Sequence, residues 1–75
     1  MKCYYIPQNH AGRLTPKNQS GTALYTENFT TCIIIAFLNF PAKNASLIHA
    51  DFHTAPQNIL SEFEWVKPSN ISVFS

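Results

Sequence analysis

The longest apolar run of this chain is TCIIIAFL, at residues 31–38. Its β-branched and aromatic side chains favour a β-strand over a helix, at about residues 31–40. Neither face of this strand is polar, so both faces need cover, as in the middle of a layered domain. The sequence therefore predicts an α+β fold with this strand at its centre.

A β-hairpin is expected from the residues that follow the run. Pro41 ends the strand, and residues 42–44 carry the small and polar side chains of a turn. A second strand then returns at about residues 45–52. Because the connection is short, we expect the two strands to pair antiparallel.

Beyond the hairpin, the apolar residues recur at helical spacing. They predict a helix at about residues 55–65, with Thr54 as its N-cap and Pro56 in its first turn. Residues 71–74 then alternate like a further strand. The C-terminal part of the chain is therefore predicted as a hairpin, a helix and a strand.

The N-terminal third is less regular. Residues 2–6 predict a short strand, and residues 7–22 show no apolar period, which is typical of a loop or a flexible arm. Residues 23–26 predict another short strand. The expected division is an N-terminal strand and arm at 1–22, followed by a partial domain at 23–75.

Composition narrows the classes of function. Of the 75 residues, 45% are hydrophobic and only 12% are charged, with a net charge of +1. So little charge on a small chain predicts that copies of itself or a partner domain cover part of its surface. The scattered basic residues exclude a nucleic-acid or membrane-surface partner. No apolar leader is present, so we expect a cytoplasmic chain in which Cys3 and Cys32 are reduced thiols.

Three residues with reactive side chains lie near the ends of the predicted hairpin strands. Cys32 begins one strand, and His49 and Asp51 end the other. In an antiparallel pair, residues directly opposite each other share a face. A turn centred between Pro41 and Ala42 puts Cys32 opposite Asp51, and a turn one residue earlier puts it opposite His49. In both registers the three side chains share one face.

This arrangement suits nucleophilic catalysis. A histidine beside a cysteine can take the thiol proton and make the thiolate, which attacks a carbonyl carbon. Each residue also has a plainer interpretation, as a core cysteine, a structural histidine or an aspartate that caps the helix. A zinc site built from Cys3, Cys32, His49 and His53 lacks a recognised ligand spacing. The three residues together favour a catalytic site without a metal.

Two segments also carry a resemblance to a known family. Residues 30–32, TTC, open the apolar strand, and residues 47–51, LIHAD, follow the turn. This pattern resembles the core of the protein N-terminal asparagine amidohydrolases over about residues 26–66, with the same spacing from cysteine to histidine. More remotely, it resembles the chemotaxis and toxin-type cysteine glutamine deamidases. In those, a threonine six residues before the cysteine, here Thr26, often completes the site.

The resemblance implies a fragment of a deamidase-type β-sandwich with helices. It implies hydrolysis of the side-chain amide of an N-terminal Asn in a protein or peptide substrate, with no metal or organic cofactor. Cys32 would be the nucleophile and His49 the general base and acid. Thr26, Thr31 or a backbone N–H near Cys32 would hold the oxyanion. Asp51 would orient His49 or bind the substrate amine. Two alternatives remain, a glutamine deamidase of the chemotaxis type and a non-catalytic interaction module.

Overall fold

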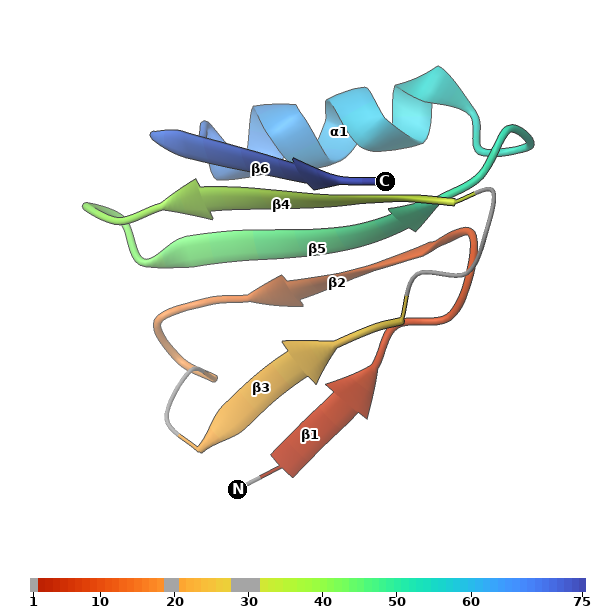
Figure 1. Ribbon diagram of the computed structural model, residues 1–75. Helices are drawn as coiled ribbons and strands as arrows, with labels where there is room; N and C mark the ends of the chain where they lie inside the picture. The colour runs from red at the N-terminus through yellow and green to blue at the C-terminus, as the bar shows by residue number, and fades with distance from the viewer. Residues whose placement is uncertain (1, 19–20, 28–31) are drawn as a thin grey trace.

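The fold is described from a computed structural model of the chain, for residues 2–18, 21–27 and 32–75. These residues form six strands and one helix, and the strands make two sheets (Figure 1). The α+β fold class is therefore confirmed. In chain order the elements are β1 (Lys2–Tyr5), β2 (His10–Leu14), β3 (Thr22–Tyr25), β4 (Ile33–Asn39), β5 (Asn44–Ala50), α1 (Pro56–Val66) and β6 (Asn70–Phe74).

The larger sheet has the strand order β2-β5-β4-β6 and is antiparallel throughout. Strand β4, which holds the apolar run, lies inside this sheet with a neighbour on each side. The predicted hairpin is confirmed, because β4 and β5 pair from Ile33 with Ala50 to Asn39 with Asn44. Its turn occupies residues 40–43, where Lys43 adopts a left-handed backbone with φ of 59°.

Helix α1 covers one face of the larger sheet (Figure 1). The core on this side contains Phe37, Ile48, Ala50 and Val66, and Val66 is only 1% exposed. The helix bounds match the prediction closely, and Pro56 lies in the first turn as expected. The predicted N-cap is wrong, because Ala55 occupies that position and makes no capping bond. The hydroxyl of Thr54 instead donates to Asn9 Oδ1 at 2.7 Å, which ties the β5–α1 loop to the β1–β2 turn.

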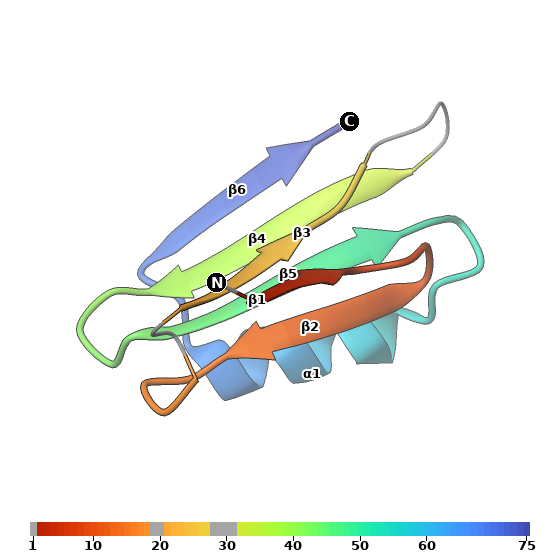
Figure 2. The same ribbon diagram turned by 90° about the horizontal axis from the view of Figure 1, so that it is seen from below.

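The opposite face of the larger sheet is covered by the smaller one. Strands β1 and β3 pair in parallel, and Figure 2 shows them in front of the larger sheet with α1 behind it. This second layer supplies the cover that a strand apolar on both faces requires. The sheets approach closely at Gly12, where a Cβ atom would collide with the Ile6 side chain and come within 3.4 Å of Leu24.

The expected loop at residues 7–22 is wrong in its middle, because β2 lies there. Strand β2 pairs antiparallel with β5, from His10 opposite His49 to Leu14 opposite Ala45. Its sequence HAGRL shows no alternation of apolar and polar residues. The strand is instead specified by its partner, because it hydrogen-bonds to the otherwise open edge of β5. It also places Gly12 where Ile6 and Leu24 of the second layer pack closely.

An ion pair between Arg13 and Glu62 joins β2 to α1. Glu62 on α1 is buried, and both its carboxylate oxygens accept from Arg13, from Nε at 2.9 Å and Nη2 at 2.7 Å. Ser46 Oγ donates to the same carboxylate at 2.6 Å. The Arg13 guanidinium also stacks 4.3 Å from the centre of the Trp65 ring. The hydrogen bonds from Arg13, followed by that from Ser46, outweigh burial and lower the pKa of Glu62.

We therefore expect this ion pair to make the fold sensitive to acid. A pKa lower in the folded than in the unfolded state stabilises the fold above the unfolded value, about 4.3 for glutamate. The stabilisation is lost as the pH falls through the lower pKa of the folded state. At pH 7, Glu62→Gln should lower the free energy of unfolding by about 2 kcal/mol, since Arg13 loses its charged partner. Urea unfolding at pH 7 and pH 3 measures both effects.

The matched control is Glu64→Gln, which changes an exposed glutamate on the same helix. It should alter the free energy of unfolding by less than about 0.5 kcal/mol. An equal acid sensitivity in wild type and Glu62→Gln would contradict this prediction.

The predicted cover by copies or a partner domain stays a prediction. Exposed apolar side chains are present on β6 and on α1 itself. Ile71 and Val73 on β6 are 52% and 61% exposed, and Leu60 on α1 is 53% exposed. In the described part of the chain, no helix has both the length and the apolar character needed to cross a membrane.

Candidate functional site

The hairpin register brings Cys32 and His49 to the same face of the larger sheet. It is the first of the two expected registers, because Ile34 pairs with His49. One step beyond the last pair, the register sets Cys32 opposite Asp51. Side chains directly opposite lie roughly 5 Å apart at Cβ, and diagonal ones roughly 7–8 Å. Cys32 therefore lies diagonally across from His49, on the face that β1 and β3 cover.

Both residues of this pair are buried. Cys32 is 7% exposed and His49 only 2% exposed. On β2, the exposed His10 stands directly opposite His49. The pair thus lies inside the domain but close to the end of the sheet where β4 begins and β5 ends (Figure 2).

Thr26 holds His49 in one orientation. Its hydroxyl donates to the carbonyl oxygen of Ile6 at 2.7 Å. A hydroxyl has one hydrogen, so Thr26 Oγ1 must accept in its other contact, which is with His49 Nδ1 at 2.8 Å. Nδ1 therefore carries the proton, and in the neutral ring the lone pair lies on Nε2.

The other ring nitrogen of His49 is the notable feature of the site. Nε2 is buried and has no hydrogen-bond partner among the described residues. Leaving a buried polar atom unpaired costs about 1–3 kcal/mol, and such atoms in folded proteins call for an explanation. With Nδ1 protonated, Nε2 carries the lone pair and can act as a base, and no described group, the Cys32 thiol included, hydrogen-bonds to it.

Asp51 has a separate set of contacts. Its Oδ2 accepts from the Gln8 side-chain amide at 2.7 Å, and its Oδ1 accepts from the backbone N–H of His53 at 2.8 Å. Thr54 Oγ1 lies 3.3 Å from the same Oδ1. The bond from Gln8 is the largest cause of the lowered pKa of Asp51, and the His53 N–H and Thr54 add to it. None of these contacts joins Asp51 to His49, whose orientation comes from Thr26.

Among the described residues, the structure thus joins Thr26 to the His49 ring by a hydrogen bond. The register sets Cys32 and Asp51 on the same face, but no hydrogen bond joins either of them to that ring. Thr31, the other candidate for the oxyanion, lies outside the described residues. Two contributors were not found in the sequence. These are the Ile6 carbonyl oxygen, which accepts from the Thr26 hydroxyl, and the Gln8 side-chain amide, which donates to Asp51 Oδ2. Both follow β1 in the N-terminal third, where the sequence predicted a strand end and a loop.

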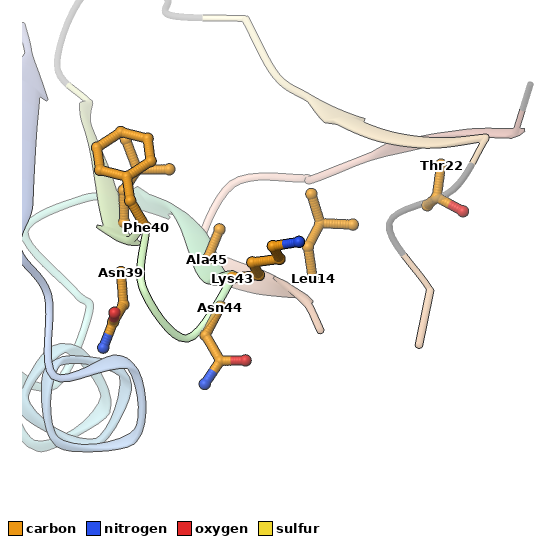
Figure 3. A pocket seen from close by; sticks show the side chains of 8 residues that line it. Leu14, Thr22, Asn39, Phe40, Lys43, Asn44 and Ala45 are labelled. Carbon is orange, nitrogen blue, oxygen red and sulfur yellow. The ribbon is translucent and has the colours of Figure 1, made fainter. Parts of the chain in front are cut away.

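The hollow, the free thiols and the possible metal ligands described next contribute no further residue to this site. An open hollow of about 360 Å³ lies at the other end of the hairpin, where Leu14, Phe40 and Lys43 are among its lining residues (Figure 3). Both Cys3 and Cys32 are free thiols. Within the described ranges, no three His, Cys, Asp or Glu side chains gather in a way that could hold a metal ion.

Comparisons with models of known protein families, with curated proteins and with solved structures found no match to this chain.

Proposed function

We propose that this protein is a cysteine-dependent amidohydrolase that deamidates an N-terminal asparagine of protein or peptide substrates. The observation that carries the proposal is the state of the buried His49. Its Nδ1 holds the proton and donates it in a hydrogen bond to Thr26, whereas its Nε2 has no partner in the described part of the chain. The His49 side chain lies on the same face of the sheet as Cys32. A general base requires a free lone pair, and Nε2 has one, although no hydrogen bond joins it to the Cys32 thiol in this structure. The choice of an asparagine substrate rests on the resemblance of residues 26–66 to the amidohydrolases.

The first half of the reaction releases ammonia. His49 Nε2 takes the thiol proton of Cys32, and the thiolate attacks the carboxamide carbon of the substrate. A carbon–sulfur bond forms, and the charge on the oxygen is stabilised by hydrogen-bond donors. The imidazolium then returns its proton to the amide nitrogen. The carbon–nitrogen bond breaks, ammonia leaves, and a thioester remains on Cys32.

The second half restores the enzyme. His49 takes a proton from a water molecule, and the resulting hydroxide attacks the thioester carbon. The carbon–sulfur bond breaks, the thiolate regains its proton, and aspartate is released. In this scheme Thr26 is a positioning residue. Its one hydroxyl hydrogen is already donated to Ile6, so the oxyanion is held by a backbone N–H near Cys32 in preference to Thr26.

The test is deamidation by the purified protein. Three peptides of otherwise equal sequence are compared, with asparagine at the N-terminus, asparagine inside, or glutamine inside. We expect ammonia release and conversion to aspartate, seen by mass spectrometry, for the first peptide only. Prior treatment with iodoacetamide should stop the reaction in a Cys3→Ser background, where Cys32 is the remaining thiol.

Other outcomes would direct the function elsewhere. Release from the internal glutamine peptide alone would replace the proposal with a glutamine deamidase, since the same cysteine chemistry serves both amides. Release from none of the three peptides would leave the interaction module.

A further inference from the structure

Asp51 is the charged group nearest to the proposed nucleophile in the hairpin register. It stands opposite Cys32, one step beyond the last pair of β4 and β5. Its carboxylate reaches neither the Thr26 hydroxyl nor the His49 ring in the contacts of the described residues. A residue with this position and no part in orienting the base is placed to contact the substrate.

The two oxygens of this carboxylate differ in how firmly they are held. Oδ1 lies in a local turn, where it accepts from the His53 backbone N–H at 2.8 Å. The Thr54 hydroxyl also contacts the Asp51 backbone N–H at 2.9 Å, so the turn is closed on itself. Oδ2 instead contacts Gln8, an exposed side chain from the turn between β1 and β2. A neutral, exposed side-chain amide is a partner that a charged donor can displace.

We propose that Asp51 Oδ2 binds the α-ammonium group of the substrate and that Gln8 occupies this position in the free protein. The inference rests on the proposed function and identifies what makes the substrate an N-terminal residue. An ammonium donates a charge-assisted hydrogen bond to a carboxylate, whereas an internal residue offers only a neutral peptide N–H. In asparagine the amine and the side-chain carboxamide are separated by a short linkage. That linkage fits two groups on directly opposite residues, roughly 5 Å apart at Cβ.

The experiment compares one Asn-initiated peptide with its N-acetylated form, in wild type and in Asp51→Asn. The variant keeps an acceptor at Oδ1 for the His53 backbone N–H, and it removes the charge and the acceptor at Oδ2. Wild type should prefer the free peptide, measured as kcat/KM, by about 100-fold. In Asp51→Asn this ratio should fall toward one. The control Gln8→Ala should keep the preference and lower KM, because the competing donor is gone.

A second measurement does not depend on turnover. In a Cys3→Ser background, the free peptide should slow the alkylation of Cys32 by iodoacetamide more than the acetylated peptide does, and Asp51→Asn should remove that difference. Turnover of both peptides at equal kcat/KM by wild type would overturn the role of Asp51 and leave the amidohydrolase proposal standing. Absence of turnover with selective protection by the free peptide would overturn the reaction and support the amine site. Equal protection by both peptides would overturn the amine site.

Discussion

Replacing Cys32 with alanine is expected to abolish ammonia release from an Asn-initiated peptide while leaving the protein folded. The proposed reaction passes through a bond to the Cys32 sulfur, so loss of the thiol should lower kcat by about 10⁴-fold or more. Cys32 is buried immediately before β4, and its side chain is small. Its truncation to alanine should lower the free energy of unfolding by only about 1 kcal/mol.

The two effects separate a catalytic cysteine from a core one. If Cys32 only filled space, Cys32→Ala would destabilise the protein, and it would lower the rate only in proportion to the fraction of protein that is folded. Kinetics and urea unfolding are therefore measured on the same preparation. Cys3→Ala is the matched control, because Cys3 is the other free thiol and lies exposed on β1. Full activity in Cys32→Ala would contradict the proposed mechanism, whatever its effect on stability.

The sequence predicted those parts of the fold that are specified locally. The apolar run, Pro41 and the short turn determine the hairpin, and the helical spacing after Pro56 determines α1. Strand β2 could not be found in this way, because its residues have no period of their own and pair with β5, from which β3 and β4 separate them along the chain. The parallel pairing of β1 with β3 is likewise a tertiary choice. It depends on the close packing of Ile6 over Gly12, which no local pattern records.

In the candidate site, too, the sequence predicted what local pattern determines and missed what depends on contacts between distant segments. The parity of the hairpin register was enough to predict that Cys32 and His49 share a face, because side chains alternate strictly along a strand. The partner of His49 is beyond that argument, since Thr26 follows β3 in the other sheet. Only the resemblance pointed to Thr26, and it suggested a different contact, with the oxyanion. The Gln8 bond to Asp51 also joins distant segments, so no sequence spacing could indicate it.

Replacing Thr26 with valine is expected to lower kcat by about 100-fold, and Thr26→Ser should restore most of that loss. Valine has nearly the shape of threonine but lacks the hydroxyl that accepts from His49 Nδ1 and donates to Ile6. Without it, the neutral imidazole can carry its proton on either nitrogen, and the fraction with a free lone pair at Nε2 falls. The ring also loses the contact that fixes its plane, and misplaced groups of this kind cost about 100-fold in rate.

A readout beyond activity distinguishes this role from a structural one. The ¹⁵N chemical shifts of the His49 ring report which nitrogen is protonated. They should show Nδ1–H in wild type and Thr26→Ser, and a mixture of both tautomers in Thr26→Val. The valine variant also leaves the Ile6 carbonyl and His49 Nδ1 without their partner, so its free energy of unfolding should fall by about 1–3 kcal/mol. If Thr26→Val kept the Nδ1–H tautomer and lost activity only in proportion to its stability, Thr26 would be a packing residue. The base would then owe its orientation to the sheet alone.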